Sequence, residues 1–166
     1  MPKIHSLHPK YLPTLLQYYE EEIAGEIYFL ELGSRFDSAV TKHHFTLLAR
    51  VERHAASMVE PLIEKYALRP RSDDTLAQVG RESVKRHEGY SWDQFVRYML
   101  RRYPLYMDDF HYLENLAPSI DLPYLEALSN HELAAIEFAE RENSGDSASE
   151  EALLAYLSTE RPTTAL

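Results

Sequence analysis

The sequence predicts an all-α fold, in which four long antiparallel helices form a bundle with an extra short crossing helix and a short C-terminal helix. Apolar side chains recur at steps of three and four residues along several long stretches, the spacing that places them on one face of a helix. The chain contains no turn-bounded run of alternating β-branched residues and only five glycines. Strands are therefore not expected.

The first half of the chain should contain two long helices and the crossing helix. The first is expected from His8 to Gly33, where glycine favours the backbone conformation that ends a helix. The second is expected from Asp37 or Ser38 to Tyr66, after a turn short enough to make the two helices antiparallel neighbours. The crossing helix is expected over Asp73–Lys85, in a crossing segment that reaches residue 87, with Ser72 or Asp73 as its N-cap.

The second half should contain the other two long helices. Ser91 and Gln94 have the spacing of a capping box and predict a helix over SWDQFVRYMLRRYPLYMDDFHYLENL. The fourth is expected from Leu122 to Glu142, where the segment NSGDS should end it. A last amphipathic helix is expected over Glu150–Ser158, within residues 148–158.

Composition predicts one domain over residues 1–166, with a bundle core at about residues 9–142. The chain has 166 residues, of which 45% are hydrophobic, enough for one core. A net charge of −10 disfavours nucleic-acid binding. Because the chain has no cysteine, any metal must bind to Glu, Asp, His or Tyr. No membrane-spanning or signal-peptide-like apolar run is found, so we expect no membrane association and a cytoplasmic location.

Three apolar stripes each contain one glutamate. Glu26 follows Tyr19 and Ile23 at helical spacing, and Glu52 and Glu132 have similar positions in the second and fourth long helices. The stripes around the last two glutamates are Phe45, Leu48, Ala55, Val59, Leu62 and Tyr66, and Leu125, Leu128, Ala135 and Ala139. We therefore expect Glu26, Glu52 and Glu132 to converge in the core as the candidate site.

Converging buried carboxylates need a compensating charge, because burial disfavours their ionised form and they repel one another. The simplest compensation is a metal ion or an arginine. His131 lies about 100° around the helix from Glu132, which makes it a further candidate ligand. His54 lies about 200° from Glu52 and should face away. Other candidates are expected at the surface, namely Glu22, within the acidic run Glu20–Glu22, and the histidines His43 and His44.

Short motifs at these glutamates resemble the ferritin-like and rubrerythrin-like proteins. They are AGE at residues 24–26, VERHAA around Glu52 and NHELAA around Glu132, and the resemblance extends over about residues 10–142. It implies a ferritin-like antiparallel four-helix bundle with a di-iron site of four carboxylates and two histidines, each histidine three residues after a glutamate.

The chain departs from that ligand pattern. Ala55 and Ala135 stand where the two histidines are expected, and Asp109 is the nearest acid to the place of the fourth carboxylate. The resemblance thus implies a divergent member with an incomplete ligand set, in which Glu26, Glu52, Glu132 and His131 hold one or two iron or manganese ions for oxygen or peroxide chemistry.

The alternative is a metal-free bundle that acts as an interaction or small-ligand-binding protein, with the three acids kept in a hydrogen-bonded core network. Arginines and tyrosines are near enough in sequence to supply the partners. They are Arg50, Arg53, Arg97, Arg101, Arg102, Tyr19, Tyr28, Tyr103 and Tyr106. An apolar face would then make a homodimer. No catalytic residue and no substrate are identified at this point.

Overall fold

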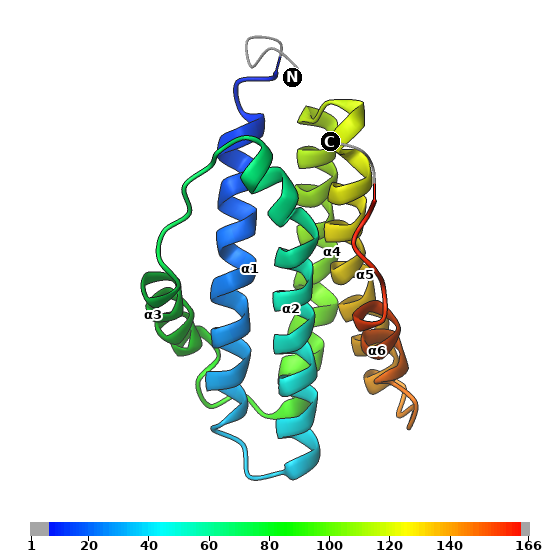
Figure 1. Ribbon diagram of the computed structural model, residues 1–166. Helices are drawn as coiled ribbons and strands as arrows, with labels where there is room; N and C mark the ends of the chain where they lie inside the picture. Colours follow the sequence, from blue (N-terminus) through cyan, green and yellow to red (C-terminus); the bar gives the residue numbers. More distant parts are fainter. Residues whose placement is uncertain (1–6, 164–166) are drawn as a thin grey trace.

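The computed structural model describes residues 7–163, which are helical with no strand; the predicted domain ends at residues 1–6 and 164–166 lie outside them. Residues 7–163 contain six α-helices and two short 3-10 helices, which follow one another in chain order (Figure 1). Their bounds are α1 Tyr11–Gly33, α2 Ala39–Lys65, α3 Asp73–Ser83, η2 Val84–His87, α4 Trp92–Leu116, η3 Ser119–Asp121, α5 Leu122–Asn143 and α6 Glu151–Leu157. The all-α prediction is therefore confirmed.

Local sequence signals account for where the helices begin and end. Ser38 and Ser72 accept hydrogen bonds from the backbone at the starts of α2 and α3. Ser91 and Gln94 form the predicted capping box at the start of α4. After α5 the chain turns through Gly145, whose φ of +75° favours glycine. These boundaries agree with the predicted ones to within a few residues.

The four long helices, α1, α2, α4 and α5, run side by side, and α6 lies against α5 and α2 (Figure 1). Helix α1 packs closely on α2, and α4 packs closely on α5, whereas α1 and α4 make little contact. Most of their buried apolar side chains form one continuous core. The looser contact between α1 and α4 leaves space between the two helix pairs.

Helix α3 lies across the outer side of α1 (Figure 1). Gly80 allows this close approach, because a Cβ atom there would lie 2.4 Å from the carbonyl oxygen of Ala24. Ile23 of α1, Ala56 of α2 and Leu76 of α3 form a small apolar cluster of their own. One face of α1 is thus buried beneath α3 instead of in the centre of the molecule.

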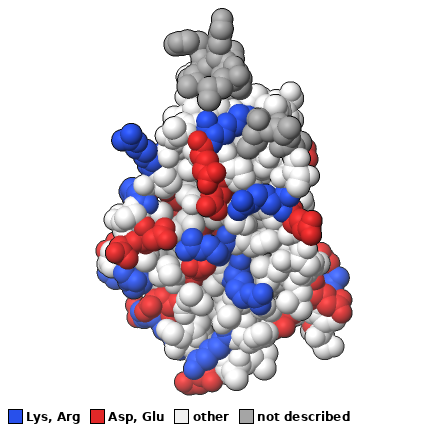
Figure 2. Space-filling model, viewed as in Figure 1, with Lys and Arg blue, Asp and Glu red and all other residues white. Residues whose placement is uncertain are grey.

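Charged side chains of both signs are interspersed on the face shown in Figure 2. Within residues 7–163, none of the helices combines the length and the apolar character needed to cross a membrane.

Candidate metal centre

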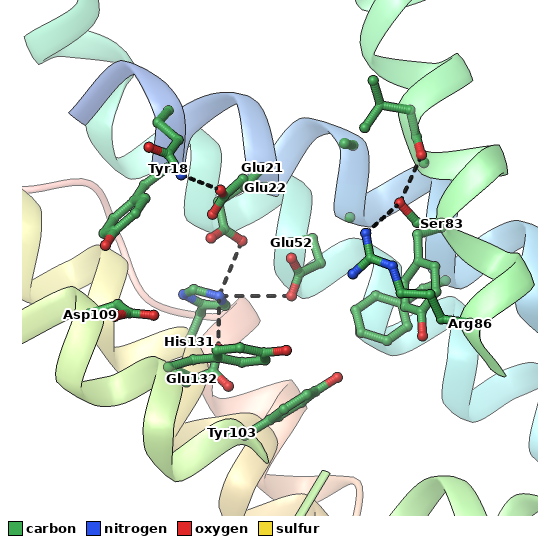
Figure 3. Close-up of a pocket in the computed structure, with 18 of the residues that line it drawn as sticks. Tyr18, Glu21, Glu22, Glu52, Ser83, Arg86, Tyr103, Asp109, His131 and Glu132 are labelled. Atoms are coloured by element: carbon green, nitrogen blue, oxygen red, sulfur yellow. Dashed lines mark hydrogen bonds and ion pairs between the residues drawn. The ribbon is translucent and has the colours of Figure 1, made fainter. Parts of the chain in front are cut away.

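A cavity of about 680 Å³ lies between α1, α4 and α5, with α2 behind it and α3 and η2 at one end (Figure 3). Its lining is acidic and aromatic. The acidic and histidine residues are Glu21, Glu22, Glu52, His87, Asp109, His131 and Glu132, and the aromatic ones are Tyr18, Tyr28, Phe29, Tyr98, Tyr103, Tyr106 and Phe110. Figure 3 shows Glu22, Glu52, His131 and Glu132 grouped around one point of the cavity.

Helix α5 provides a buried histidine at the centre of this group. Only 1% of the His131 surface is exposed. Its Nδ1 contacts the carbonyl oxygen of Leu128, one turn earlier in the helix, and a proton on Nδ1 makes that contact a hydrogen bond. In this tautomer Nε2 has no proton and directs its lone pair at the neighbouring carboxyl groups.

Glutamates from three helices surround His131 Nε2. Glu22 Oε2 lies 3.1 Å from it, Glu132 Oε2 3.6 Å and Glu52 Oε1 3.8 Å. Apart from the approach of Glu22 to the histidine, Glu22 Oε2 and Glu132 Oε1 are buried and make no hydrogen bond within the described residues 7–163. Burying an unpaired carboxyl oxygen costs free energy unless a proton or a cation compensates its charge.

Glycine at position 25 makes room for one of these carboxylates. A Cβ atom on Gly25 of α1 would lie 2.5 Å from Glu52 Oε2 of α2. The Glu52 side chain is 15% exposed, and its open side faces the cavity. The absence of a side chain at residue 25 therefore lets the Glu52 carboxyl group lie against α1 beside Glu22.

Burial raises the pKa of all three glutamates. The pKa of Glu22 is raised to about 8 by desolvation, with the negative charge of Glu132 adding to it and a hydrogen bond with Glu52 opposing it. Desolvation also raises the pKa of Glu132 to about 8, against the influence of His131. The pKa of Glu52 is raised well above its usual value by burial and by Glu22. At neutral pH the cluster therefore retains protons unless a cation replaces them.

Glu26, predicted to share this site, lies elsewhere. Its two carboxylate oxygens each accept a hydrogen bond of 3.0 Å from Arg53, and it does not line the cavity. The prediction of convergence is wrong for Glu26, because its stripe includes Ile23, which packs beneath α3. Arginine pairing, which the metal-free alternative invoked, thus occurs at this glutamate.

Glu22 takes the place predicted for Glu26, although it was expected at the surface. Its neighbour Glu20 is also buried and binds Arg71 through a 2.7 Å contact with the guanidinium group, whereas Glu21 is exposed at the cavity. A second helical row in the sequence could have identified Glu22. That row is Tyr11, Leu15, Tyr18, Glu22, Gly25, Phe29 and Leu32, at alternating steps of four and three.

The remaining predicted positions divide between the cavity and the surrounding structure. Glu52, Glu132 and His131 are brought together as described. His54 lies outside the cavity, with Nε2 3.0 Å from the carbonyl oxygen of Thr159. Ala55 and Ala135, which stand where the sequence resemblance led us to expect histidines, are buried in the apolar core.

His43 and His44 were both predicted at the surface. His43 is 58% exposed, as predicted. The prediction for His44 is wrong: it is 6% exposed and stacks on Trp92, because α4 and α5 cover this side of α2.

The arrangement suits a single metal ion. One ligand atom from each of Glu22, Glu52 and His131 can be chosen so that all three lie within 4.8 Å of one another; no other such group occurs among the described residues. Two carboxylates and an imidazole fit a first-row divalent ion. In comparisons with known proteins, no family model, no curated protein and no solved structure matches the chain.

Proposed function

We propose that this protein is a ferritin-like helical protein that binds one iron or manganese ion through Glu22, Glu52 and His131 for oxygen or peroxide chemistry. The observation that carries the proposal is the orientation of His131, whose Nδ1 contacts a backbone carbonyl while Nε2 faces two carboxyl groups from other helices. Metal-binding histidines are commonly oriented in this way by a hydrogen bond from the second ring nitrogen. Oxygen and imidazole ligands suit iron and manganese.

The ferritin-like part of the proposal rests on the sequence resemblance and on the helix arrangement. The close pairs are α1 with α2 and α4 with α5, and a connection containing α3 joins them. Bundles of this kind build metal sites from inward carboxylates and histidines on separate helices. Here α1, α2 and α5 each supply one candidate ligand.

Of the one or two ions that the resemblance implies for this chain, a single one is proposed. A dinuclear site needs more carboxylates and a second histidine. His87 also lines the cavity, but its Nδ1 is 2.6 Å from the hydroxyl group of Tyr28. Glu132, next to His131, would then be a proton-holding neighbour of a mononuclear centre.

A bound iron or manganese ion would supply the electrons exchanged with oxygen or peroxide. The protein's own contribution is to hold protons close by. Glu132, with its pKa raised to about 8 by desolvation, can take up or release a proton near neutral pH. Tyr103 of α4, buried and close enough to be influenced by Glu132 and Glu52, offers a hydroxyl group on the same side of the cavity as Glu132.

The metal-free alternative is a small-ligand-binding protein in which Glu22, Glu52 and Glu132 stay protonated. Their raised pKa values are what favours it, since neutral carboxyl groups need no cation. The two proposals differ in one measurable property, the retention of a metal ion.

Metal content distinguishes them. We expect protein expressed in medium supplemented with iron or manganese to retain about one ion per chain, measured by elemental analysis. Glu22→Gln and Glu52→Gln should each lose it, because an amide replaces the anionic ligand at nearly the same volume.

Glu26→Gln is the matched control, since Glu26 lies on the same helix as Glu22 but binds Arg53 outside the cavity. It should retain the metal of the unmodified protein. A metal content near zero in the unmodified protein, or equal losses in Glu26→Gln and Glu52→Gln, would exclude the proposed centre.

A further inference from the structure

The cavity extends beyond the glutamate–histidine cluster to an arginine at its other end. Figure 3 shows Arg86 and Ser83 there, on the far side of Glu52 from His131. Arg86 belongs to η2 and is exposed, at the border between the cavity and solvent. The cavity thus has a cationic end, whereas Glu21 and Asp109 lie at the opposite end, beside Tyr18.

Arg86 has no carboxylate partner among residues 7–163. Its only hydrogen bond in that range is a weak one of 3.5 Å to the hydroxyl group of Ser83. The other arginine in the cavity lining, Arg71, is already paired with Glu20 at 2.7 Å. An unpaired guanidinium group has donors in a planar fork that matches a carboxylate.

Aromatic rings line the space between Arg86 and the cluster. The rings of His87 and Tyr98 have centroids 4.2 Å apart, and those of Tyr98 and Tyr103 6.2 Å apart. The hydroxyl groups of Tyr98 and Tyr106 lie 3.2 Å from each other, so one of the two keeps a free proton to donate. Tyr103 makes no hydrogen bond with the described part of the chain. These walls provide apolar surface with a few hydroxyl groups.

We propose that the cavity binds a small aromatic carboxylate, whose carboxylate group pairs with Arg86 and whose ring lies among the tyrosines. A volume of about 680 Å³ is ample for a one-ring or two-ring molecule. The far end of the ring then points toward Glu52 and His131. Only this last statement, that the ring is presented to a metal ion, rests on the proposed function.

An organic cation is the competing ligand, because the cavity contains several carboxyl groups. Three of these groups, on Glu22, Glu52 and Glu132, gather around His131 Nε2, at the other end of the aromatic space from Arg86. The carboxyl groups of Glu21 and Asp109 lie at the end of the cavity opposite Arg86. The aromatic part of the cavity therefore offers an anion site.

Three probes of nearly the same shape test the charge preference. They are 4-hydroxybenzoate, the neutral 4-hydroxybenzamide and the cationic 4-hydroxybenzylamine, titrated calorimetrically into the full chain in the presence of EDTA. We expect the acid to bind about 10-fold more tightly than the amide, the size of effect typical of a charge-assisted hydrogen-bond pair. Arg86→Gln should reduce the affinity for the acid to that for the amide and leave the amide unchanged.

Arg97→Gln is the control, since Arg97 is an exposed arginine of α4 that does not line the cavity. Its affinity for the acid should equal that of the unmodified protein. The proposal is overturned if the three probes bind equally or not at all, or if the amine binds most tightly. It is also overturned if Arg97→Gln reduces the affinity for the acid as much as Arg86→Gln does.

The orientation is tested separately with 4-fluorobenzoate in the presence of Mn²⁺. We expect the fluorine nucleus to relax faster with Mn²⁺ than with Mg²⁺, and Glu52→Gln to abolish the difference. Binding in EDTA without this relaxation effect supports the Arg86 anchor and contradicts the orientation of the ring toward a metal ion; the metal content of the unmodified protein then shows whether the metal centre itself fails. Retention of a metal ion without binding of the acid supports the metal centre and contradicts the Arg86 anchor.

Discussion

Two histidines of this protein are each buried among glutamates, yet their surroundings differ. His44 Nδ1 lies 2.9 Å from Glu150 and its Nε2 3.3 Å from Glu142. The Glu142 carboxylate in turn accepts hydrogen bonds from Trp92 Nε1 at 2.8 Å and from a serine hydroxyl group at 2.5 Å. At His131, Glu22 Oε2 lies 3.1 Å from Nε2. Within the described residues, each cluster contains buried atoms that make no hydrogen bond, namely His44 Nδ1 in the first and Glu22 Oε2 and Glu132 Oε1 in the second.

The difference shows that residue types alone do not distinguish a structural cluster from a candidate site. The His44 cluster links α2, α4, α5 and the start of α6, and Glu142 of α5 has its partners within the protein. The His131 cluster borders the cavity, and its two unsatisfied buried atoms are carboxyl oxygens. Unsatisfied buried oxygens beside a cavity, more than the presence of histidine and glutamate, indicate where a ligand belongs.

The largest expected effect is the pH dependence of the apo protein. Glu22 and Glu132 have folded-state pKa values of about 8, against 4.5 in the unfolded chain. The folded state therefore binds more protons, and stability is lost as pH rises from 4.5 toward 8. We expect a loss of about 1.4 kcal/mol per pH unit for each carboxyl group that stays protonated on folding.

Urea unfolding in EDTA between pH 6.5 and 8 measures this slope. His87, whose pKa is lowered by burial and by Arg86, has the opposite pH dependence, which ends near its ordinary value of 6.5. Glu22→Gln should flatten the slope, and saturating Mn²⁺ should reduce or reverse it, because a metal ion favours the ionised carboxyl groups. If the stability of the apo protein instead rises with pH in this range, the glutamates of the cluster do not keep their protons on folding.

Next in size is the loss of stability when the structural cluster is broken. His44→Ala leaves Glu142 and Glu150 without their imidazole and should destabilise the protein by about 3 kcal/mol. Metal content should stay the same. The neighbouring His43→Ala should change stability by less than about 0.5 kcal/mol, because His43 is exposed. Equal effects of the two substitutions, measured by urea unfolding, would show that the His44 cluster contributes no more than a surface pair.

The corresponding change at His131 should affect metal binding instead. His131→Gln is expected to weaken Mn²⁺ binding by about 100-fold, equivalent to about 2.7 kcal/mol, through loss of the imidazole ligand. Isothermal titration measures the affinity. Nitrogen hyperfine coupling in the electron paramagnetic resonance spectrum of the Mn²⁺ complex should be present in the unmodified protein and in His44→Ala, and absent in His131→Gln. Coupling that survives in His131→Gln would assign the ligand to another histidine.

The smallest expected effect comes from the residue that makes room for Glu52. In Gly25→Ala the new methyl group would lie 2.5 Å from Glu52 Oε2 and displace the carboxyl group. Mn²⁺ affinity should fall about 10-fold, or about 1.4 kcal/mol. Stability of the apo protein should not fall, because alanine is favoured over glycine within a helix. Unchanged metal affinity would show that the Glu52 position is not set by Gly25.

Much of the fold could be predicted because its signals are local. The capping serines at 38, 72 and 91 and the glycine-containing segment after α5 mark helix ends, since they interact with backbone groups a few residues away. The stripes containing Glu52 and Glu132 were likewise predicted to face inward, and both glutamates line the cavity. The predictions of a homodimer, of no nucleic-acid partner and of a cytoplasmic location stay predictions.

The helices, their caps and two of the inward glutamates were thus determined by the sequence itself, because periodicity and capping act over one or two turns. Which glutamate of α1 points inward was decided only in the tertiary structure. Two adjacent rows on α1 have the same spacing, one with Glu26 and one with Glu22. Packing of α3 on α1 at Gly80, together with Arg53 opposite Glu26, set the rotation that directs Glu22 to His131. No pattern within a single helix contains that information, because it depends on contacts between residues distant in the chain.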